Sequence, residues 1–315
     1  MRFVLVAAWA WCCLAASSDD QQFNGRWDIA INGASPPRGW WLEISGAGTT
    51  NLKGKFVGGS VGLIDEIPKL SISDGELRFA LEGRFRRDRT LEKGLYWARY
   101  EDSKLKGTFE IEGDPSSYLE WTGVRAPAVS DKDDGTWKKT DPMVLFDGHD
   151  LAGWQPLGRS PGWTVRDGIL TGLTLAPDLA SEKKFWNFSL DVEYRISPHA
   201  NSGLGLRGRY EVQIADDIDR APSKNGSGAI LGRIAPTANV ARLPGEWQTM
   251  SVRLVGRQVT VSLNGVRVVD RQTIDGPTSI MLDANESDPG PILIQCDHGP
   301  VEFRKIVVSP LVKRP

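Results

Sequence analysis

The stretch QVTVSLNGVRVVD, residues 258–270, contains two β-branched, apolar runs around the dipeptide Asn264-Gly265. Asn-Gly is the preferred sequence for a two-residue hairpin turn, because both turn positions need a positive φ. The runs Gln258–Leu263 and Val266–Asp270 therefore predict two adjacent antiparallel strands.

Similar runs occur on both sides of this hairpin, and no stretch of the chain has a sustained helical period. This many short strands predict an all-β fold, with an antiparallel jelly-roll sandwich over residues 143–315. The other strands predicted in this block are Lys184–Arg195, Gly203–Leu206, Tyr210–Ala215, Trp247–Leu254, Ile292–Gln295 and Val301–Val308.

In residues 19–127, short strand-like runs are likewise separated by glycines and polar turns. This pattern predicts a small antiparallel β-barrel-like domain. A polar, charge-rich stretch, APAVSDKDDGTWKKTD at residues 126–141, predicts a linker over residues 128–142. The strands predicted in the first block are Trp27–Ile31, Gly39–Ile44, Leu52–Phe56, Leu70–Ile72, Leu77–Leu81, Gly94–Tyr100, Lys104–Ile111 and Leu119–Val124.

Gly25-Arg26-Trp27 at the first predicted strand and Arg125 after the last one resemble a lipocalin-type barrel. In that barrel an early Trp closes the floor and a late Arg stacks across it. The resemblance therefore implies a structural role for Trp27.

The chain begins with Arg2, an apolar run from Phe3 to Ala16 and then small and polar residues, which is the secretory pattern. This predicts a signal peptide over residues 1–18 and an exported protein, periplasmic or extracellular; the alternative is a retained N-terminal anchor. Two of the three cysteines lie in this leader, so the mature protein would keep Cys296 alone and have no internal disulfide. No later segment is apolar enough to predict a membrane span in the mature protein.

The formal net charge is −2, with 25% charged and 40% hydrophobic residues. This balance gives no electrostatic reason to expect nucleic acid or an anionic membrane as a partner. Tryptophan is abundant, with 12 residues. Its rings either fill β-sheet cores or offer flat faces on which sugars stack.

Glu211 and Gln213 alternate with Tyr210, Val212 and Ile214 along one predicted strand. Because side chains at i and i+2 share a face of a strand, the apolar set predicts a core face. The carboxylate and the amide then lie together on the opposite face. That face is either solvated or the ligand-holding concave face of the sandwich.

Arg207 lies four residues before Glu211, so the two side chains could meet on paired strands. An arginine beside a glutamate lowers the carboxyl pKa and can bind substrate oxygens, although a plain ion pair is the alternative. Asn201 either caps a turn or binds a sugar hydroxyl.

Three histidines are available, and His298, just before a predicted strand, is the candidate for acid–base chemistry at neutral pH. His149 is expected to be structural, and His199 could line the site. The chain has no zinc-binding pattern, and no cofactor is predicted. Calcium or another oxygen-ligated metal is left open by the acidic residues Asp216, Asp217, Asp219 and Asp297.

The second block resembles the 3-keto-disaccharide hydrolase domain family, which has a concanavalin-like sandwich. Two departures are Ser262, where the family often has Trp, and an acidic insertion around residues 283–289; neither is expected to touch the candidate site residues. The matching segments, in order, are LFDGHDLAGW (145–154), WTVRDGIL (163–170), the strand from Phe188 to Arg195, ANSGLGLRGRYEVQI (200–214), GAILG (228–232), PGEWQTM (244–250), LNGVRVVD (263–270) and DHGPVEFRKI (297–306).

The resemblance implies cleavage of the glycosidic bond of a 3-keto-glycoside by C2 proton abstraction, elimination and hydration, with an oligosaccharide or glycoside as substrate. One base and donors for an enolate suffice for this chemistry, and our hypothesis assigns Glu211 or His298 as the base. Alternatives are a non-catalytic, lectin-like carbohydrate-binding protein, and an N-terminal barrel that serves interaction or substrate delivery. The predicted substrate-binding residues are Asn201, Arg207, Gln213, Asp297 and Trp247.

Overall fold

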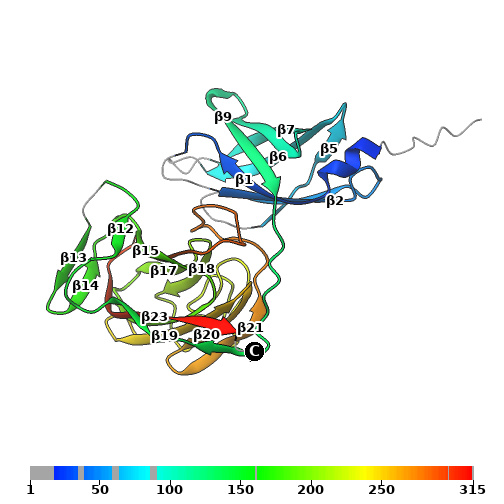
Figure 1. The fold of residues 1–315 in the computed structure, drawn as a ribbon. Coiled ribbons are helices and arrows are strands. Elements are labelled where there is room, and N and C mark those ends of the chain that lie inside the picture. Colours follow the sequence, from blue (N-terminus) through cyan, green and yellow to red (C-terminus); the bar gives the residue numbers. More distant parts are fainter. Residues whose placement is uncertain are drawn as a thin grey trace, which may run out of the picture.

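The computed structural model describes residues 18–34, 39–58, 64–85, 91–159, 162–296 and 298–313. These residues form 23 strands and one short 3-10 helix, η1 (Ser18–Phe23), and contain no α-helix. The predicted all-β class is therefore confirmed. Figure 1 shows a curled sheet of the N-terminal strands above a sandwich of the later ones.

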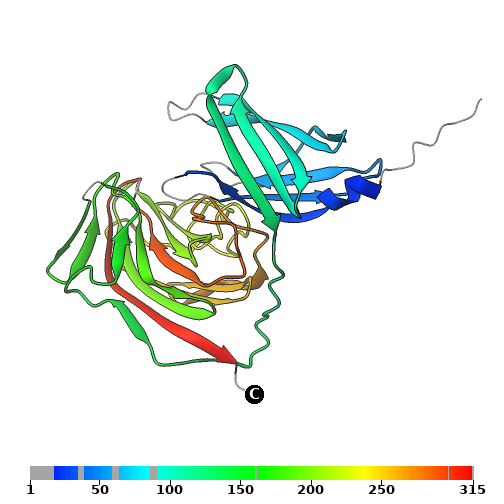
Figure 2. The ribbon, with the colours of Figure 1, turned by 45° about the horizontal axis from the view of Figure 1, so that its top comes forward.

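The N-terminal sheet has nine strands in the order β4-β3-β2-β1-β9-β8-β7-β6-β5. Because β1 pairs with β9, the two ends of this segment meet in the middle of the sheet. Figure 2 shows that the sheet curls strongly. Its strands are β1 (Gly25–Ile31), β2 (Gly39–Ser45), β3 (Lys53–Val57), β4 (Asp65–Glu66), β5 (Leu70–Ser73), β6 (Glu76–Phe85), β7 (Leu91–Glu101), β8 (Lys104–Ile111) and β9 (Asp114–Arg125).

The interior of this barrel-like sheet, called the barrel below, is aromatic, and Trp27 is fully buried in it. The guanidinium of Arg125 lies 4.0 Å from the centre of the Trp27 ring and donates hydrogen bonds to the carbonyls of Gln22 and Asn24. The stacking expected from the lipocalin-like motif is thus present. Arg125 thereby joins the end of β9 to the turn that precedes β1.

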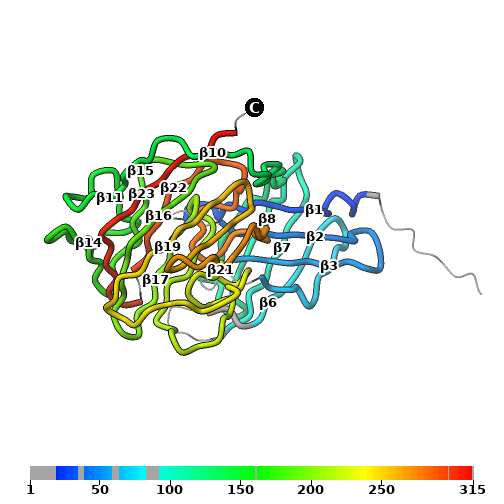
Figure 3. Tube along the Cα trace, turned by 90° about the horizontal axis from the view of Figure 1, so that it is seen from below, coloured from blue at the N-terminus to red at the C-terminus, as the bar shows by residue number. Residues whose placement is uncertain are grey.

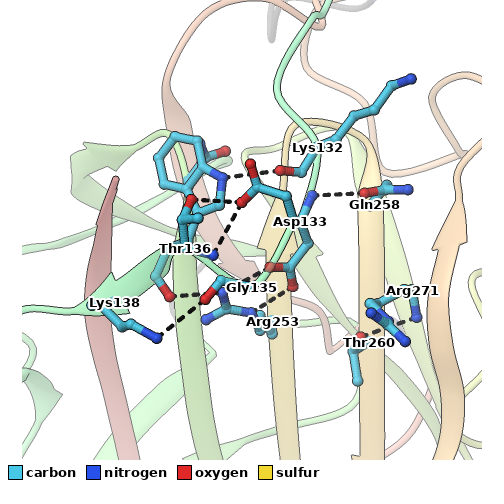
Figure 4. A network of polar contacts seen from close by, with 12 residues as sticks. Lys132, Asp133, Gly135, Thr136, Lys138, Arg253, Gln258, Thr260 and Arg271 are labelled. Atoms are coloured by element: carbon cyan, nitrogen blue, oxygen red, sulfur yellow. Dashed lines mark hydrogen bonds and ion pairs between the residues drawn. The ribbon is translucent and has the colours of Figure 1, made fainter. Parts of the chain in front are cut away.

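The predicted linker region is held against the sandwich by hydrogen bonds (Figure 4). Asp133 accepts two bonds from Arg253, at 2.6 and 2.9 Å, and its backbone N–H donates to Gln258. The hydrogen bonds from Arg253 hold the pKa of Asp133 below its usual range. Asp131 accepts bonds from the side chains of Trp186 and Asn187.

The sandwich has two antiparallel sheets, seen from below beside the barrel in Figure 3. The larger has the order β13-β14-β23-β16-β19-β20-β21, with β10 and β11 also paired to β23, and the smaller has the order β12-β15-β22-β17-β18. The strands are β10 (Trp137–Lys139), β11 (Met143–Phe146), β12 (Trp154–Pro156), β13 (Trp163–Arg166), β14 (Ile169–Gly172), β15 (Leu179–Phe185), β16 (Phe188–Ile196), β17 (Asn201–Leu206), β18 (Tyr210–Ala215), β19 (Gln248–Val255), β20 (Gln258–Leu263), β21 (Val266–Thr273), β22 (Gly290–Ile294) and β23 (Val301–Lys313).

One predicted strand, Lys184–Arg195, is interrupted in the structure. The chain leaves the smaller sheet at Phe185 and enters the larger sheet at Phe188. Asn187 stabilises this change of sheet, because its side-chain oxygen accepts a bond from the Gly256 N–H and its carbonyl accepts one from Leu311. The apolar pattern does not reveal the break, because Phe185 and Phe188 both lie in the sandwich core.

The two domains meet at residues 275–289, between β21 and β22, which we call the bridging segment. It appears in orange between barrel and sandwich in Figure 1. Met281 and Ala284 of this segment form a small apolar cluster with Trp41 and Val57 of the barrel. Among the described residues, no helix is long and apolar enough to cross a membrane.

Candidate functional site

The candidate site lies on the face of the smaller sheet that points away from the sandwich core. On β18, Tyr210, Val212 and Ile214 are fully buried in that core, as the alternation predicts. Glu211 and Gln213 share the opposite face but are not solvated, with 2% and 4% of their surface exposed. Another part of the chain therefore covers this face.

Glycines on β17 provide the space into which these side chains fit. Gly203 pairs with Gln213, and Gly205 pairs with Glu211. A Cβ on Gly203 would lie 2.6 Å from Oε1 of Glu211, so the carboxylate rests on the β17 backbone. Glycine is needed here because any side chain would displace the carboxylate.

The bridging segment holds Glu211 in place. The hydroxyl of Ser279 donates a 2.9 Å hydrogen bond to Oε2 of Glu211. The backbone N–H of Glu211 donates to Oγ1 of Thr278, also at 2.9 Å. Two adjacent residues therefore hold Glu211, Ser279 at its carboxylate and Thr278 at its backbone.

Two glutamines share the outer face of the smaller sheet with Glu211, on either side of β17. Gln213 follows Glu211 on β18, and Gln295 follows β22, where its N–H donates to the Gly203 carbonyl at 3.0 Å. The Oε1 atoms of both glutamines are buried and have no hydrogen-bond partner among the described residues. An unpaired buried acceptor costs about 1–3 kcal/mol, which a ligand that donates a hydrogen bond would recover.

The other end of this face is more open. Asn201 is half-buried and pairs with Ala215, and its N–H donates to the carbonyl of exposed His298 at 2.9 Å. Four residues of strand separate Asn201 from Gly205, or about 13 Å. The site is therefore a strip with Glu211 at its covered end and Asn201 and His298 at its open end. Asp297, the other residue predicted here, lies outside the described residues.

Arg207 does not join this strip. It lies in the β17–β18 turn, fully buried, with its guanidinium 4.2 Å from the centre of the Trp186 ring and over Tyr210 on the core face. It also donates to the carbonyls of Glu286 and Gly256. The expectation that Arg207 sits beside Glu211 is wrong, because the turn directs its side chain to the other face of β18. The acidic insertion was also expected to avoid the candidate residues, but Glu286 contacts Arg207.

Trp247 does not lie on the sheet that carries the strip, because it precedes β19 in the larger sheet. Its ring is flanked by the guanidinium groups of Arg195 and Arg304, at 4.8 and 4.4 Å. A pocket of about 250 Å³ nearby includes Arg195 and Glu302, which pair with each other. This pocket is built on β16 and β23 rather than on the sheet that carries Glu211.

The remaining polar candidates have roles in turns. Asp216 accepts a bond from the backbone N–H of His199, whose side chain is 97% exposed. Asp217 accepts bonds from the N–H and hydroxyl of Ser227. The N–H of His149 donates to Asp147 in another turn. Among the described residues, no three His, Cys, Asp or Glu side chains are grouped closely enough to hold a metal ion.

Sequence reasoning missed Gln295, Thr278 and Ser279. Gln295 ends a predicted strand, and alternation from the buried Ile292 and Ile294 would have placed it on the outer face. Thr278 and Ser279 lie in a segment without a repeating pattern, so nothing in the sequence indicates that they reach Glu211.

Comparison with known proteins gives one family match. A family model described as a 3-keto-alpha-glucoside-1,2-lyase-like domain matches residues 141–309. No curated protein matches the chain.

Several solved structures are similar to part of the chain. Two come from Parabacteroides distasonis ATCC 8503 and are provisionally named glycosyl hydrolases. One is 28% identical, covers 58% of this chain and 91% of its own, and has a TM-score of 0.48. The other is 25% identical, covers 54% of this chain and 100% of its own, with a TM-score of 0.44. The carbohydrate binding module CBM66 from Bacillus subtilis is 12% identical and covers 50% of this chain and 95% of its own, with a TM-score of 0.37.

Proposed function

Because the chain belongs to the family of 3-keto-alpha-glucoside-1,2-lyase-like domains, we propose that it cleaves the glycosidic bond of a sugar oxidised at C3. Membership makes it a carbohydrate-active protein. The proposal adds the substrate class, a 3-keto-glycoside, and the residues that act on it.

The observation that carries the proposal is the pair of buried amide oxygens beside an oriented carboxylate. Gln213 and Gln295 each present an Oε1 atom without a partner among the described residues. Sugar hydroxyls are donors of the kind these atoms lack. A ring bound beside the Glu211 carboxylate, which itself lies over Gly203, would place its hydroxyls toward the two amides and its C–H bonds toward Glu211.

In the proposed reaction the Glu211 carboxylate removes the proton from C2, which the neighbouring 3-keto group makes acidic. The electron pair of the C2–H bond first forms an enolate, C2=C3–O⁻. When the C3 carbonyl re-forms, that pair makes a C1=C2 double bond as the C1–O bond to the leaving alcohol breaks. Amide N–H groups of Gln213 and Gln295 would donate to the enolate oxygen that develops at C3. Water then adds across the double bond to give the free 3-keto sugar.

His298 lies at the open end of the strip and is exposed. In this scheme it returns a proton to the departing oxygen, and Asn201 binds a hydroxyl of the second sugar. The two roles could also be exchanged, with His298 as the base and Glu211 as the proton donor. Substituting each residue in turn distinguishes the two assignments.

The test is release of sugar from 3-keto-trehalose, with unoxidised trehalose as the control substrate. We expect the full-length mature protein to release sugar from the keto compound alone. Glu211→Gln should lower the rate by about 10²- to 10⁴-fold, the usual contribution of a general base. Full turnover by both Glu211→Gln and His298→Ala would refute the assignment.

Absence of turnover with either sugar, combined with binding in calorimetry, would instead support a lectin-like protein. In that case Gln213→Met and Gln295→Met should each still weaken binding, by about tenfold.

Export of the protein is part of the same proposal, since residues 1–18 carry the secretory pattern. An intact mass beginning after residues 16–18 in secreted or periplasmic material would support it. A full-length mass in the membrane fraction would support a retained anchor.

A further inference from the structure

The bridging segment touches the candidate site with one set of side chains and the barrel with another. Toward the site, Ser279 and Thr278 bind Glu211, as described above. The N–H of Thr278 donates to the Arg209 carbonyl, and that of Leu282 donates to the Gly208 carbonyl, both at 2.8 Å. These bonds attach the segment to the turn that begins β18.

Toward the barrel, the same segment is packed without a gap. Met281 and Ala284, only two and five residues after Ser279, are 7% and 3% exposed and lie against Trp41. A Cβ on Gly39 would lie 2.6 Å from the backbone nitrogen of Ala284. Trp41 itself is fully buried, although it points out of the barrel and is not part of the barrel core. The bridging segment therefore covers it together with the guanidinium of Arg26, which lies 4.3 Å from the centre of its ring.

A second chain of contacts runs through the charged residues. Arg26 of β1 pairs with Asp275 at 3.1 Å and with Glu286 at 3.6 Å. Glu286 accepts a 2.6 Å hydrogen bond from the hydroxyl of Tyr210, which precedes Glu211 on β18. Two sets of contacts therefore connect the outer face of the barrel to β18. We call the contacts through Trp41 and Met281 the apolar route and those through Arg26 and Glu286 the ionic route.

We propose that the barrel positions the Glu211 carboxylate through the bridging segment, and that Trp41 and Arg26 are positioning residues for the site. Residues 278–281 cannot shift without breaking either the Ser279–Glu211 bond or the packing of Met281 on Trp41. The assignment of a catalytic effect rests on the proposed function, whereas the mechanical link between barrel and site does not.

The first experiment measures hydrogen exchange in the full-length protein and therefore needs no substrate. In Trp41→Ala, the amides of Glu211 and Thr278 should exchange about tenfold faster or more, because the contacts that protect them loosen. Exchange in β6 to β8 and in β16 should stay unchanged. Trp41→Phe should restore most of the protection, and Tyr118→Ala, which removes a half-exposed aromatic elsewhere on the barrel, is the matched control.

Unchanged exchange at Glu211 and Thr278 in both Trp41→Ala and Arg26→Gln would overturn the proposal. Arg26→Gln keeps the test valid if Trp41→Ala fails to fold, since the Arg26 side chain is 21% exposed and belongs to the ionic route.

The second experiment uses turnover of 3-keto-trehalose. Trp41→Ala should lower kcat about tenfold with little change in KM, as expected when a reacting group is misplaced while the groups that bind the substrate stay in position. In a Ser279→Ala background, Trp41→Ala should have almost no further effect on kcat, because the Ser279–Glu211 hydrogen bond through which it acts is already absent. A full tenfold loss in that background would overturn the proposed route. If the wild-type protein turns over no 3-keto sugar, the proposed function fails, and the exchange result still decides the positioning role.

Discussion

Replacing Asp28 by asparagine is expected to make the free energy of unfolding less dependent on pH between 5 and 8. Asp28 lies on β1 at the domain interface, is 6% exposed, and neither carboxylate oxygen has a hydrogen-bond partner among the described residues. Burial, and then the charges of Glu286 and Asp283, raise its pKa to about 7, while Arg26 and Arg209 oppose the rise. The folded protein therefore favours the neutral acid.

The sign and size of the effect follow from this pKa. Between pH 3.8 and about 7 the folded protein holds a proton on Asp28 that the unfolded chain has lost, so stability falls as pH rises. Each pH unit in this window is worth about 1.4 kcal/mol. Over the whole window the loss is about 4 kcal/mol, and from pH 5 to 7 it is about 3 kcal/mol. Above pH 7 this carboxyl contributes little further change.

Urea unfolding of wild type and Asp28→Asn at pH 5 and pH 8, followed by tryptophan fluorescence, measures this directly. Relative to wild type, the variant should gain about 3 kcal/mol on going from pH 5 to pH 8. Glu120→Gln, at an exposed position of the same sheet, should show no such gain. An equal difference between wild type and Asp28→Asn at both pH values would refute the reasoning, since Asp28 would then be ionised throughout.

Three further substitutions test the geometry. Gly203→Ala should displace the Glu211 carboxylate, since the new Cβ would lie 2.6 Å from Oε1. We expect about tenfold or greater loss of turnover, with an unchanged far-ultraviolet circular dichroism spectrum. Arg125→Ala should lower the stability of the barrel by about 1–3 kcal/mol, because it removes the stack on Trp27 and two hydrogen bonds; an unchanged urea midpoint would contradict this. Trp247→Ala should leave sugar binding in calorimetry unchanged, because its ring lies on the other sheet; weakened binding would place the sugar there instead.

Much of the fold follows from local signals. The hairpin expected at Asn264-Gly265 is present, with φ of 51° and 81° at the two positions. The core face of β18 follows from alternation, because a strand has only two faces. The contact between Arg125 and Trp27 spans most of the barrel sequence and could be predicted because the motif itself specifies the pair.

The candidate site was only partly predictable. Alternation places Glu211 and Gln213 on one face, but it says nothing about what lies against that face. Arg207 was assigned to the site by its spacing from Glu211, and the turn geometry, with φ of 54° at Arg207, carries its side chain elsewhere. Trp247 was assigned by its motif, although its strand belongs to the other sheet.

The sequence by itself determined the strands, the hairpin turns and the family of the second domain, because each depends on neighbouring residues or on motif order. Only the tertiary structure decided that Gln295 and Gln213 lie on either side of Gly203 and that Ser279 holds Glu211. It also decided that Trp41 of the barrel supports the segment that carries Ser279. These contacts join residues far apart in the chain, and their partners are set by how sheets and domains pack rather than by any local pattern.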